Sequence, residues 1–289
     1  MTHSKSAKHG LFILCTASFL VPFMGSALNL ALPEMSEFFS MKAVSLTWLA
    51  TAYLISTAIF QIPFARIADL VGRKKIFHFG VFIFTISTFL CGFAPNFALL
   101  IVLRFVSGIG SAMMSGTTIA ILTSLFPPEQ RGKALGINVA TVYAALAAGP
   151  FLGGLLTHYF GWQSIFYTCG AVGLIVLLLS AFLLHGEWVE AKGERFDLRG
   201  SILYGVGLAS LIYGFSSLPH IDGSLCLTAG VLAFVVFILF ERKQKFPVFN
   251  VRLFSGNKVF CLSSVAALIN YAATFAIAFM LSLYLQYVR

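Results

Sequence analysis

The chain has 289 residues, of which 59% are hydrophobic and only 10% are charged. A soluble domain carries roughly 25% charged residues, so this composition, with a mean hydropathy of +0.93, excludes a soluble globular protein and indicates an integral membrane protein. The formal net charge of +9 must first be tested as a topology signal before it is taken to indicate nucleic acid.

Nine segments are apolar and close to the roughly 20 residues that a bilayer-spanning helix needs. In chain order they are 11–33, 45–64, 76–93, 97–124, 134–156, 163–184, 198–218, 224–240 and 259–287. Strands of a membrane barrel need only about 9–11 residues, so the segments predict helices. The first segment also exceeds the roughly 7–15 apolar residues of a secretory signal peptide. The predicted fold class is therefore an all-α integral membrane protein.

Basic residues gather in alternate loops. When the amino terminus is placed inside, most of the 19 Lys and Arg residues fall on the inner side, and the positive-inside rule then predicts a multi-pass protein of the cell membrane with a cytoplasmic amino terminus. The basic charge is thereby explained, and no nucleic-acid partner is predicted. Acidic residues fall in loops or at helix ends, so no carboxylate is expected near the bilayer midplane. The five cysteines are scattered, and they predict no metal or cofactor site.

A short charged segment, residues 65–75, lies between the second and third spans and is expected to be a loop held at the membrane surface. Asp69 can accept charge-assisted hydrogen bonds from Arg73 or from a helix amino terminus. Gly72 allows a tight turn. Lys74 and Lys75 are typical of anchors to the inner surface, but an anchor alone does not need Asp69, Gly72 and Arg73.

Arg104 lies several residues inside the fourth span. An arginine within the membrane costs at least about 2.5 kcal/mol on insertion scales and usually faces a polar cavity or a partner. We therefore expect a functional side chain that points into the bundle. The alternative is that Arg104 extends to the outer headgroups. Small residues that follow it, Gly108 among them, permit close helix contact.

The fifth span contains a proline among glycines. Pro150 removes a backbone donor and bends a helix, while Gly149 and Gly153, four residues apart, let a neighbouring helix pack closely. Gly154 follows directly. A static kink is the alternative to a helix that must move. The glycines at 108 and 110 are not a dinucleotide loop, because they lie inside an apolar helix, and the chain has no Walker sequence.

Together these motifs resemble the major facilitator superfamily. The segment from Ala65 to Lys74 is similar to its loop 2–3 signature, with Ala65 in place of the first glycine. Arg104 with Gly108 looks like the fourth-helix motif, and Gly149, Pro150, Gly153 and Gly154 are similar to the antiporter motif. Residues 29–33, which begin with Asn29, match the end of the first helix in the fourteen-spanning drug:proton antiporter branch.

The resemblance implies a six-helix domain over residues 1–186, a cytoplasmic linker over 187–197, two extra helices over 198–245, and the first helix of a second domain over 246–289. It also implies alternating access to a site near the midplane, proton-coupled efflux of drugs or other small molecules, and no enzymatic activity. Asp69 and Arg73 would latch one domain against the other. Residues expected to line the cavity are Asn29, Arg104, Asn138, Tyr143 and Asn270.

Two departures from the branch pattern matter. Met24 stands where the branch commonly has an acidic residue, and five further helices of a fourteen-spanning member are expected beyond residue 289. Two alternatives follow. One is a transporter of a neutral or anionic metabolite with Arg104 as counter-ion. The other is a fragment that does not transport without a separate carboxy-terminal half.

Overall fold

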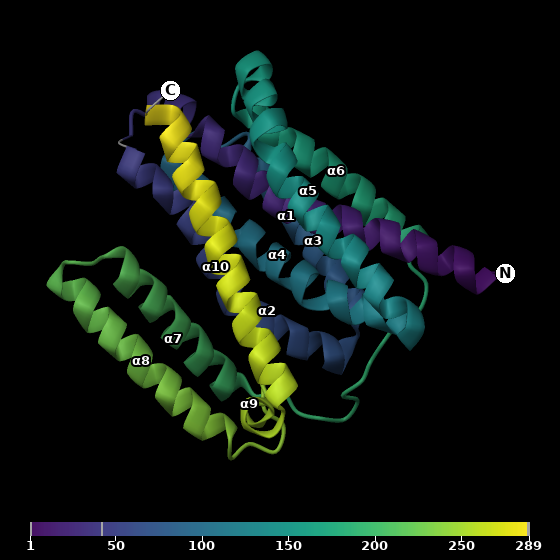
Figure 1. Ribbon diagram of the computed structural model, residues 1–289. Helices are drawn as coiled ribbons and strands as arrows, with labels where there is room; N and C mark the ends of the chain where they lie inside the picture. The colour runs from purple at the N-terminus through teal and green to yellow at the C-terminus, as the bar shows by residue number, and fades with distance from the viewer. Residues whose placement is uncertain (1, 42, 288–289) are drawn as a thin grey trace.

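The computed structural model describes residues 2–41 and 43–287, and these residues form ten helices without a strand (Figure 1). The first six are α1 (Thr2–Phe39), α2 (Ala43–Val71), α3 (Arg73–Cys91), α4 (Phe97–Leu125), α5 (Pro128–Phe160) and α6 (Gln163–Leu183). The remaining four are α7 (Leu198–Ser216), α8 (Ile221–Glu241), the single turn α9 (Arg252–Gly256) and α10 (Lys258–Tyr287).

Eight helices in the described part of the chain, α1 to α8, are long and apolar enough to cross a membrane. Each overlaps one of the first eight predicted segments: five helices cover the whole segment, and α3, α6 and α7 end one or two residues before the predicted end. The ninth segment is also helical, but the apolar stretch described there covers only Lys258–Thr274 and is too short to count as a span. A ninth membrane crossing therefore stays a prediction.

The charged segment at 65–75 is not the loop that its composition predicted. Helix α2 continues through Asp69 to Val71, and α3 begins at Arg73, so only Gly72 separates the two helices. Gly72 has φ of +132°, a conformation that side chains disfavour, and its N–H donates to the carbonyl of Ala68 at 2.8 Å. The sharp change of direction is made by one glycine, and the polar residues on each side stay helical.

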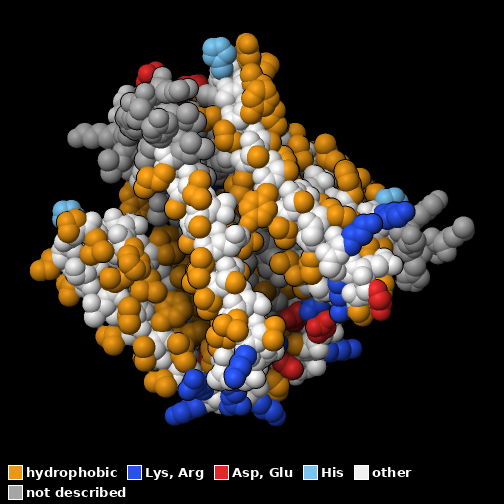
Figure 2. Space-filling view, viewed as in Figure 1, with side chains coloured by type: hydrophobic (Ala, Val, Ile, Leu, Met, Phe, Trp, Pro, Cys, Tyr) orange, Lys and Arg blue, Asp and Glu red, His pale blue; other side chains and the backbone are white. Residues whose placement is uncertain are grey.

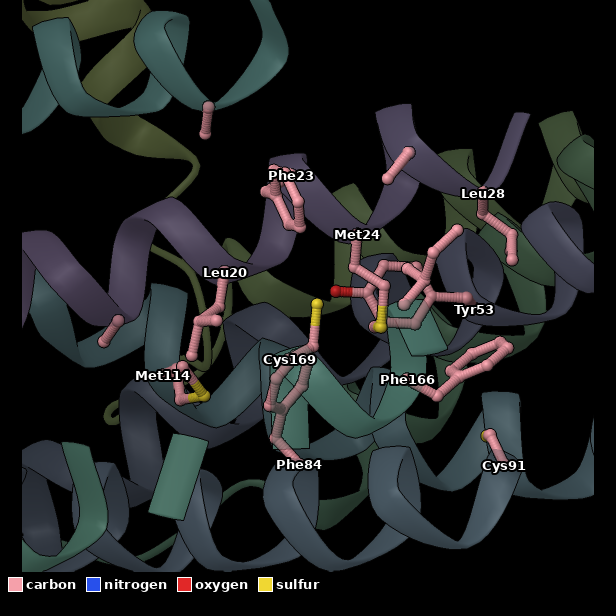
Figure 3. Close-up of a cluster of buried hydrophobic side chains, with 14 of the residues drawn as sticks. Leu20, Phe23, Met24, Leu28, Tyr53, Phe84, Cys91, Met114, Phe166 and Cys169 are labelled. Atoms are coloured by element: carbon pink, nitrogen blue, oxygen red, sulfur yellow. The ribbon is translucent and has the colours of Figure 1, made fainter. Parts of the chain in front are cut away.

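Helices α1 to α6 form one bundle around a continuous hydrophobic core. Figure 3 shows side chains from five of these helices meeting in that core, including Met24 from α1, Tyr53 from α2, Phe84 from α3, Met114 from α4 and Phe166 from α6. Tyr53 is 3% exposed and the other four are 0–1% exposed. The core fixes the relative positions of the helices that carry the candidate site.

Glycines let the helix backbones touch. A Cβ at Gly110 of α4 would lie 2.5 Å from the backbone nitrogen of Phe84 and 2.7 Å from the carbonyl oxygen of Gly80, both in α3. A Cβ at Gly153 of α5 would lie 2.7 Å from the Cα of Ala27 in α1. Contacts this close leave no room for any side chain, as expected for small-residue interfaces in membranes.

Helices α7 and α8 form a hairpin that stands beside the bundle, and α7 packs on α2 (Figure 1). The hydroxyl of Tyr204 in α7 donates to the carbonyl of Ala58 in α2 at 3.1 Å. Helix α10 runs across the bundle in the same view. Figure 2 shows hydrophobic side chains over the helix walls, and Lys and Arg gathered along the lower and right-hand edges with acidic groups between them.

The substitution Gly110→Ala should destabilise the bundle by about 1–3 kcal/mol, because its methyl group must push two backbones apart. Gly136→Ala is the matched control: this glycine lies inside α5, and a Cβ added there would meet nothing within 4 Å, so alanine should stabilise the helix by up to about 1 kcal/mol. Thermal unfolding midpoints of the purified proteins in detergent compare the two. Equal midpoints would show that α3 and α4 are not in backbone contact.

Candidate functional site

Gly72 leaves room for a carboxylate. A Cβ on this residue would lie 2.5 Å from the carboxyl carbon of Glu187, in the segment that follows α6. Glu187 Oε1 accepts the backbone N–H of Lys74 at 2.9 Å, at the exposed amino end of α3. A carboxylate at a helix amino terminus is favoured by the helix dipole, and Gly72 is the residue that lets it approach.

Arg73 is the centre of the site. It is 7% exposed, its Nε donates to Asp69 Oδ1 at 2.8 Å, and its Nη1 donates to Ser124 Oγ of α4 at 3.0 Å. The guanidinium also contacts both carboxylate oxygens of Glu190, at 2.8 and 2.7 Å. Bidentate contacts of this kind are among the stronger polar interactions in proteins. The predicted contact between Asp69 and Arg73 is therefore present, within a larger network.

The segment between α6 and α7, residues 184–197, binds along this network. Arg73 N–H donates to the carbonyl of Trp188, and Ala191 N–H donates to the carbonyl of Asp69, both at 3.0 Å. Glu194 pairs with Arg66 of α2. In the described part of the chain, Asp69 and Arg73 thus hold their own bundle and its linker. The predicted contact with a second domain stays a prediction.

Sequence reasoning missed the three glutamates of the linker, Glu187, Glu190 and Glu194, as partners. The sequence contained a signal for them: the longest hydrophilic break has three glutamates as well as Asp197, and the segment at 65–75 offers Arg66, Arg73 and Lys74 as basic partners. Ala65, which replaces a glycine of the family signature, lies against α4. Its Cβ is 3.3 Å from the position of a Cβ on Gly116.

Arg104 points into the bundle and is 1% exposed. Its Nε donates to the carbonyl of Leu49 at 3.3 Å, and its guanidinium carbon lies 4.2 Å from the ring centroid of Tyr53, which places a cation over an aromatic face. The alternative of a side chain that extends to the headgroups is wrong. Among the described residues, Arg104 Nη1 has no hydrogen-bond partner.

Gly108 brings α4 against α2 one turn further on. A Cβ there would lie 2.6 Å from the carbonyl oxygen of Tyr53 and 2.7 Å from the Cβ of Ser56. The hydroxyl of Ser56 in turn donates to the carbonyl of Phe105 at 2.7 Å. The fourth-helix motif therefore combines a buried cation with the close helix contact that places it.

The antiporter-like motif of α5 packs on α1. A Cβ on Gly149 would lie 2.5 Å from the Cβ of Ser26, and Ser26 Oγ donates to the carbonyl of Leu146 at 3.0 Å. Gly154 has ordinary contact distance, 3.5 Å, to Leu30. Pro150 lies inside the continuous helix Pro128–Phe160. Gly149 and Gly153 thus have the packing role that their spacing predicted.

The cavity candidates divide into two groups. Asn138 is buried, and its Nδ2 donates to Ser18 Oγ of α1 at 2.8 Å, so it joins α5 to α1 and does not line open space. Asn270 Nδ2 of α10 donates to the hydroxyl of Tyr143 of α5 at 3.0 Å, and Asn29 of α1 is exposed. The structure brings Tyr143 and Asn270 together from segments 127 residues apart.

Comparison with known proteins identifies a family. The Major Facilitator Superfamily matches residues 14–289. The chain is 30% identical to the uncharacterized MFS-type transporter YhcA of Bacillus subtilis, over 98% of this chain and 54% of that protein. It is 29% identical to the riboflavin transporter RibZ of Clostridioides difficile, over 96% and 61%. It is 30% identical to the multidrug resistance protein Stp of Mycobacterium tuberculosis, over 97% and 52%.

A solved structure shares the fold. The crystal structure of a bacterial homolog to the human lysosomal transporter Spinster, inward-facing and unoccupied, matches 83% of this chain and 61% of that chain with a TM-score of 0.56 and 20% identity. At this identity the likeness concerns the fold alone. The chain spans about half to three-fifths of the length of the curated relatives it matches.

The substitution Glu190→Gln should loosen the linker, because it removes the charge that meets both arms of the Arg73 guanidinium. Trypsin should then cleave after the exposed Lys192 and Arg195 about 3- to 10-fold faster, the factor expected for loss of about 1 kcal/mol. Glu129→Gln, an exposed glutamate in the first turn of α5, is the control and should leave the rate unchanged. Equal cleavage of all three proteins would contradict the binding of the linker by Arg73.

Proposed function

The chain belongs to the major facilitator superfamily, and from that premise we propose that it is the amino-terminal part of a secondary active transporter. The transporter exports drugs or other small molecules in exchange for protons by alternating access. Its parts are the six-helix domain 1–186, the linker 187–197, the two added helices over 198–245, and the start of a second domain over 246–289. The amino terminus is cytoplasmic. Relatives named for multidrug resistance and for resistance to methylenomycin A support export.

The observation that carries the proposal is the hydrogen bond between Tyr143 and Asn270. Polar side chains within apolar membrane helices are costly unless they face one another or a water-filled path. Here one such side chain belongs to α5 of the six-helix bundle, and the other belongs to α10, which the proposed division assigns to the second domain. A substrate site between two rocking domains requires polar groups at that boundary.

In this proposal, the contacts around Arg73 form in one state of the transport cycle and break in the other. Its charges lie at the cytoplasmic ends of α2, α3 and α4, where a moving second domain would have to close. Protonation of Asp69 would remove one charge-assisted bond to Arg73 and would shift the equilibrium between closed and open forms. Substrate and proton would then act on different parts of the same bundle.

Transport by the complete protein in energised membrane vesicles tests the proposal. Dye efflux should stop when a protonophore collapses the proton gradient, and Asp69→Asn should lower the rate at least about tenfold, in keeping with loss of about 1.4 kcal/mol from one of the two states. Efflux that survives the protonophore excludes proton coupling. Efflux that is normal in Asp69→Asn excludes the latch.

Tyr143→Phe tests the substrate path separately, because it removes one hydroxyl and keeps the ring. The Michaelis constant for the exported dye should rise about 3- to 10-fold, the effect of one lost hydrogen bond. Tyr159→Phe is the control, because Tyr159 is 70% exposed near the end of α5, and it should leave transport unchanged. Equal Michaelis constants for the two variants would show that Tyr143 does not contact the transported substrate.

A second candidate function is transport of an anionic or neutral metabolite, which the buried Arg104 favours together with a relative named as a riboflavin transporter. Arg104 would be the counter-ion. If it binds an anion with both arms, Arg104→Lys should abolish anion transport and spare cationic dyes, since lysine cannot reproduce a bidentate contact. Loss of both activities would instead assign Arg104 to the contact between α2 and α4.

A further inference from the structure

A cavity of about 680 Å³ opens beside the first turns of α3 and borders the site described above at Lys74 and Glu187. It lies between the amino end of α3 and the segment that follows α6. Its wall is formed by Lys74, Lys75, His78, Phe79, Phe82, Gly186 and Glu187. Neither the Arg73 network nor the contact between Tyr143 and Asn270 uses this cavity.

The lining changes from charged to apolar along α3. Lys74 and Lys75 lie in the first turn, and Phe79 and Phe82 follow one to two turns further into the span. The two aromatic rings are 52% and 43% exposed at the residue level, and they lie nearly parallel, with centroids 6.2 Å apart and planes 14° from each other. A ligand that fills this cavity therefore meets cations at one end and an apolar wall at the other.

The charged end favours a negative group. Its wall contains two lysines and one carboxylate, Glu187, whose Oε1 already accepts the backbone N–H groups of Lys74 and Trp188 at 2.9 and 3.3 Å. The imidazole of His78 is fixed by a 2.9 Å hydrogen bond between Nδ1 and Ser180 Oγ of α6. The cavity thus has surplus positive charge at its polar end, with an oriented ring beneath it.

The depth of the cavity indicates the kind of ligand. Arg73 begins a membrane-spanning helix, so the lysines of its first turn lie where lipid headgroups lie, and Phe79 and Phe82 lie at the level of the acyl chains. Aromatic and basic side chains in this order are typical of the membrane interface. Basic pockets of membrane proteins at headgroup depth bind anionic lipid headgroups.

We infer that this cavity binds one anionic phospholipid, with its phosphodiester at Lys74 and Lys75 and its acyl chains along Phe79 and Phe82. The inference needs only the membrane location of α3 and does not depend on transport. Because Lys74 and Glu187 also belong to the linker contacts, a bound lipid would add to the forces that hold the segment after α6 on the bundle.

Native mass spectrometry of the complete protein, released from detergent after incubation with defined lipids, tests the inference. Phosphatidylglycerol should be retained in preference to phosphatidylcholine. The variant Lys74→Gln/Lys75→Gln should lose retention of phosphatidylglycerol at least about fivefold, since each lysine near an anionic surface contributes roughly a fivefold factor. The control variant is Lys243→Gln/Lys245→Gln, which removes two exposed charges after α8 and should retain the lipid.

Three results would overturn the inference: equal retention of both lipids by the parent protein, equal loss in the two double variants, or retention of soluble glycerol 3-phosphate as strong as that of the lipid. The last would assign the cavity to a free phosphate. Phe79→Ala provides a second route if the double variant does not fold, because it keeps both charges. It should lower phosphatidylglycerol retention at least about threefold, and unchanged retention would contradict the acyl-chain contact.

Discussion

Helix pairs in this bundle come into backbone contact at glycines, and these contacts position the helices that carry both buried arginines. In a bilayer the surrounding lipid is as apolar as a leucine, so helices associate through close packing and polar contacts. Gly110 meets Gly80 and Phe84, Gly108 meets Tyr53, and Gly153 meets Ala27. The first two contacts hold α4 against α3 and α2, and this is why Arg104 lies over the ring of Tyr53 and Arg73 reaches Ser124.

Charge is used differently at the two depths. At the junction of α2 and α3, Arg73 contacts the carboxylate of Asp69 near the end of α2 and that of Glu190 on the linker. Inside the span, Arg104 has a carbonyl and an aromatic face, and among the described residues it has no carboxylate. A buried cation without a matching anion is expensive. Arg73 joins α2, α3, α4 and the linker, while Arg104 places a charge inside the bundle.

The order of helices could be predicted from the sequence because a bilayer demands about 20 apolar residues for each crossing. The ends of the helices could not. Helix α2 continues through Arg66 and Asp69, since leaving the membrane does not stop a helix, and only Gly72 breaks it. The contact between Asp69 and Arg73 could be predicted, because the sequence places an acid at the end of one span and a cation at the start of the next, with Gly72 between them. Arg73 and Glu190 are 117 residues apart in the sequence. Their contact could not be predicted, because local sequence patterns do not determine the path of a loop over the protein surface.

Polar residues in the spans also show which features local sequence predicts and which depend on the tertiary fold. Asn138 and Tyr143 look alike in the sequence, as polar groups in an apolar helix, and the pattern predicts that both line a cavity. They lie on different sides of α5: Asn138 meets Ser18 in the interior, whereas Tyr143 meets Asn270 of α10. Which side of a helix faces its neighbours depends on where its glycines allow close packing.

A segment such as that between α6 and α7 would ordinarily be regarded as a flexible linker that leaves the position of the α7–α8 hairpin variable. Here the main chain is hydrogen-bonded to α2 and α3 at Asp69 and Arg73, and side chains fasten it at Glu187, Glu190 and Glu194. Asp197 then caps α7 by accepting the N–H of Gly200. The start of the α7–α8 hairpin is accordingly held in place by named contacts along the whole of this segment.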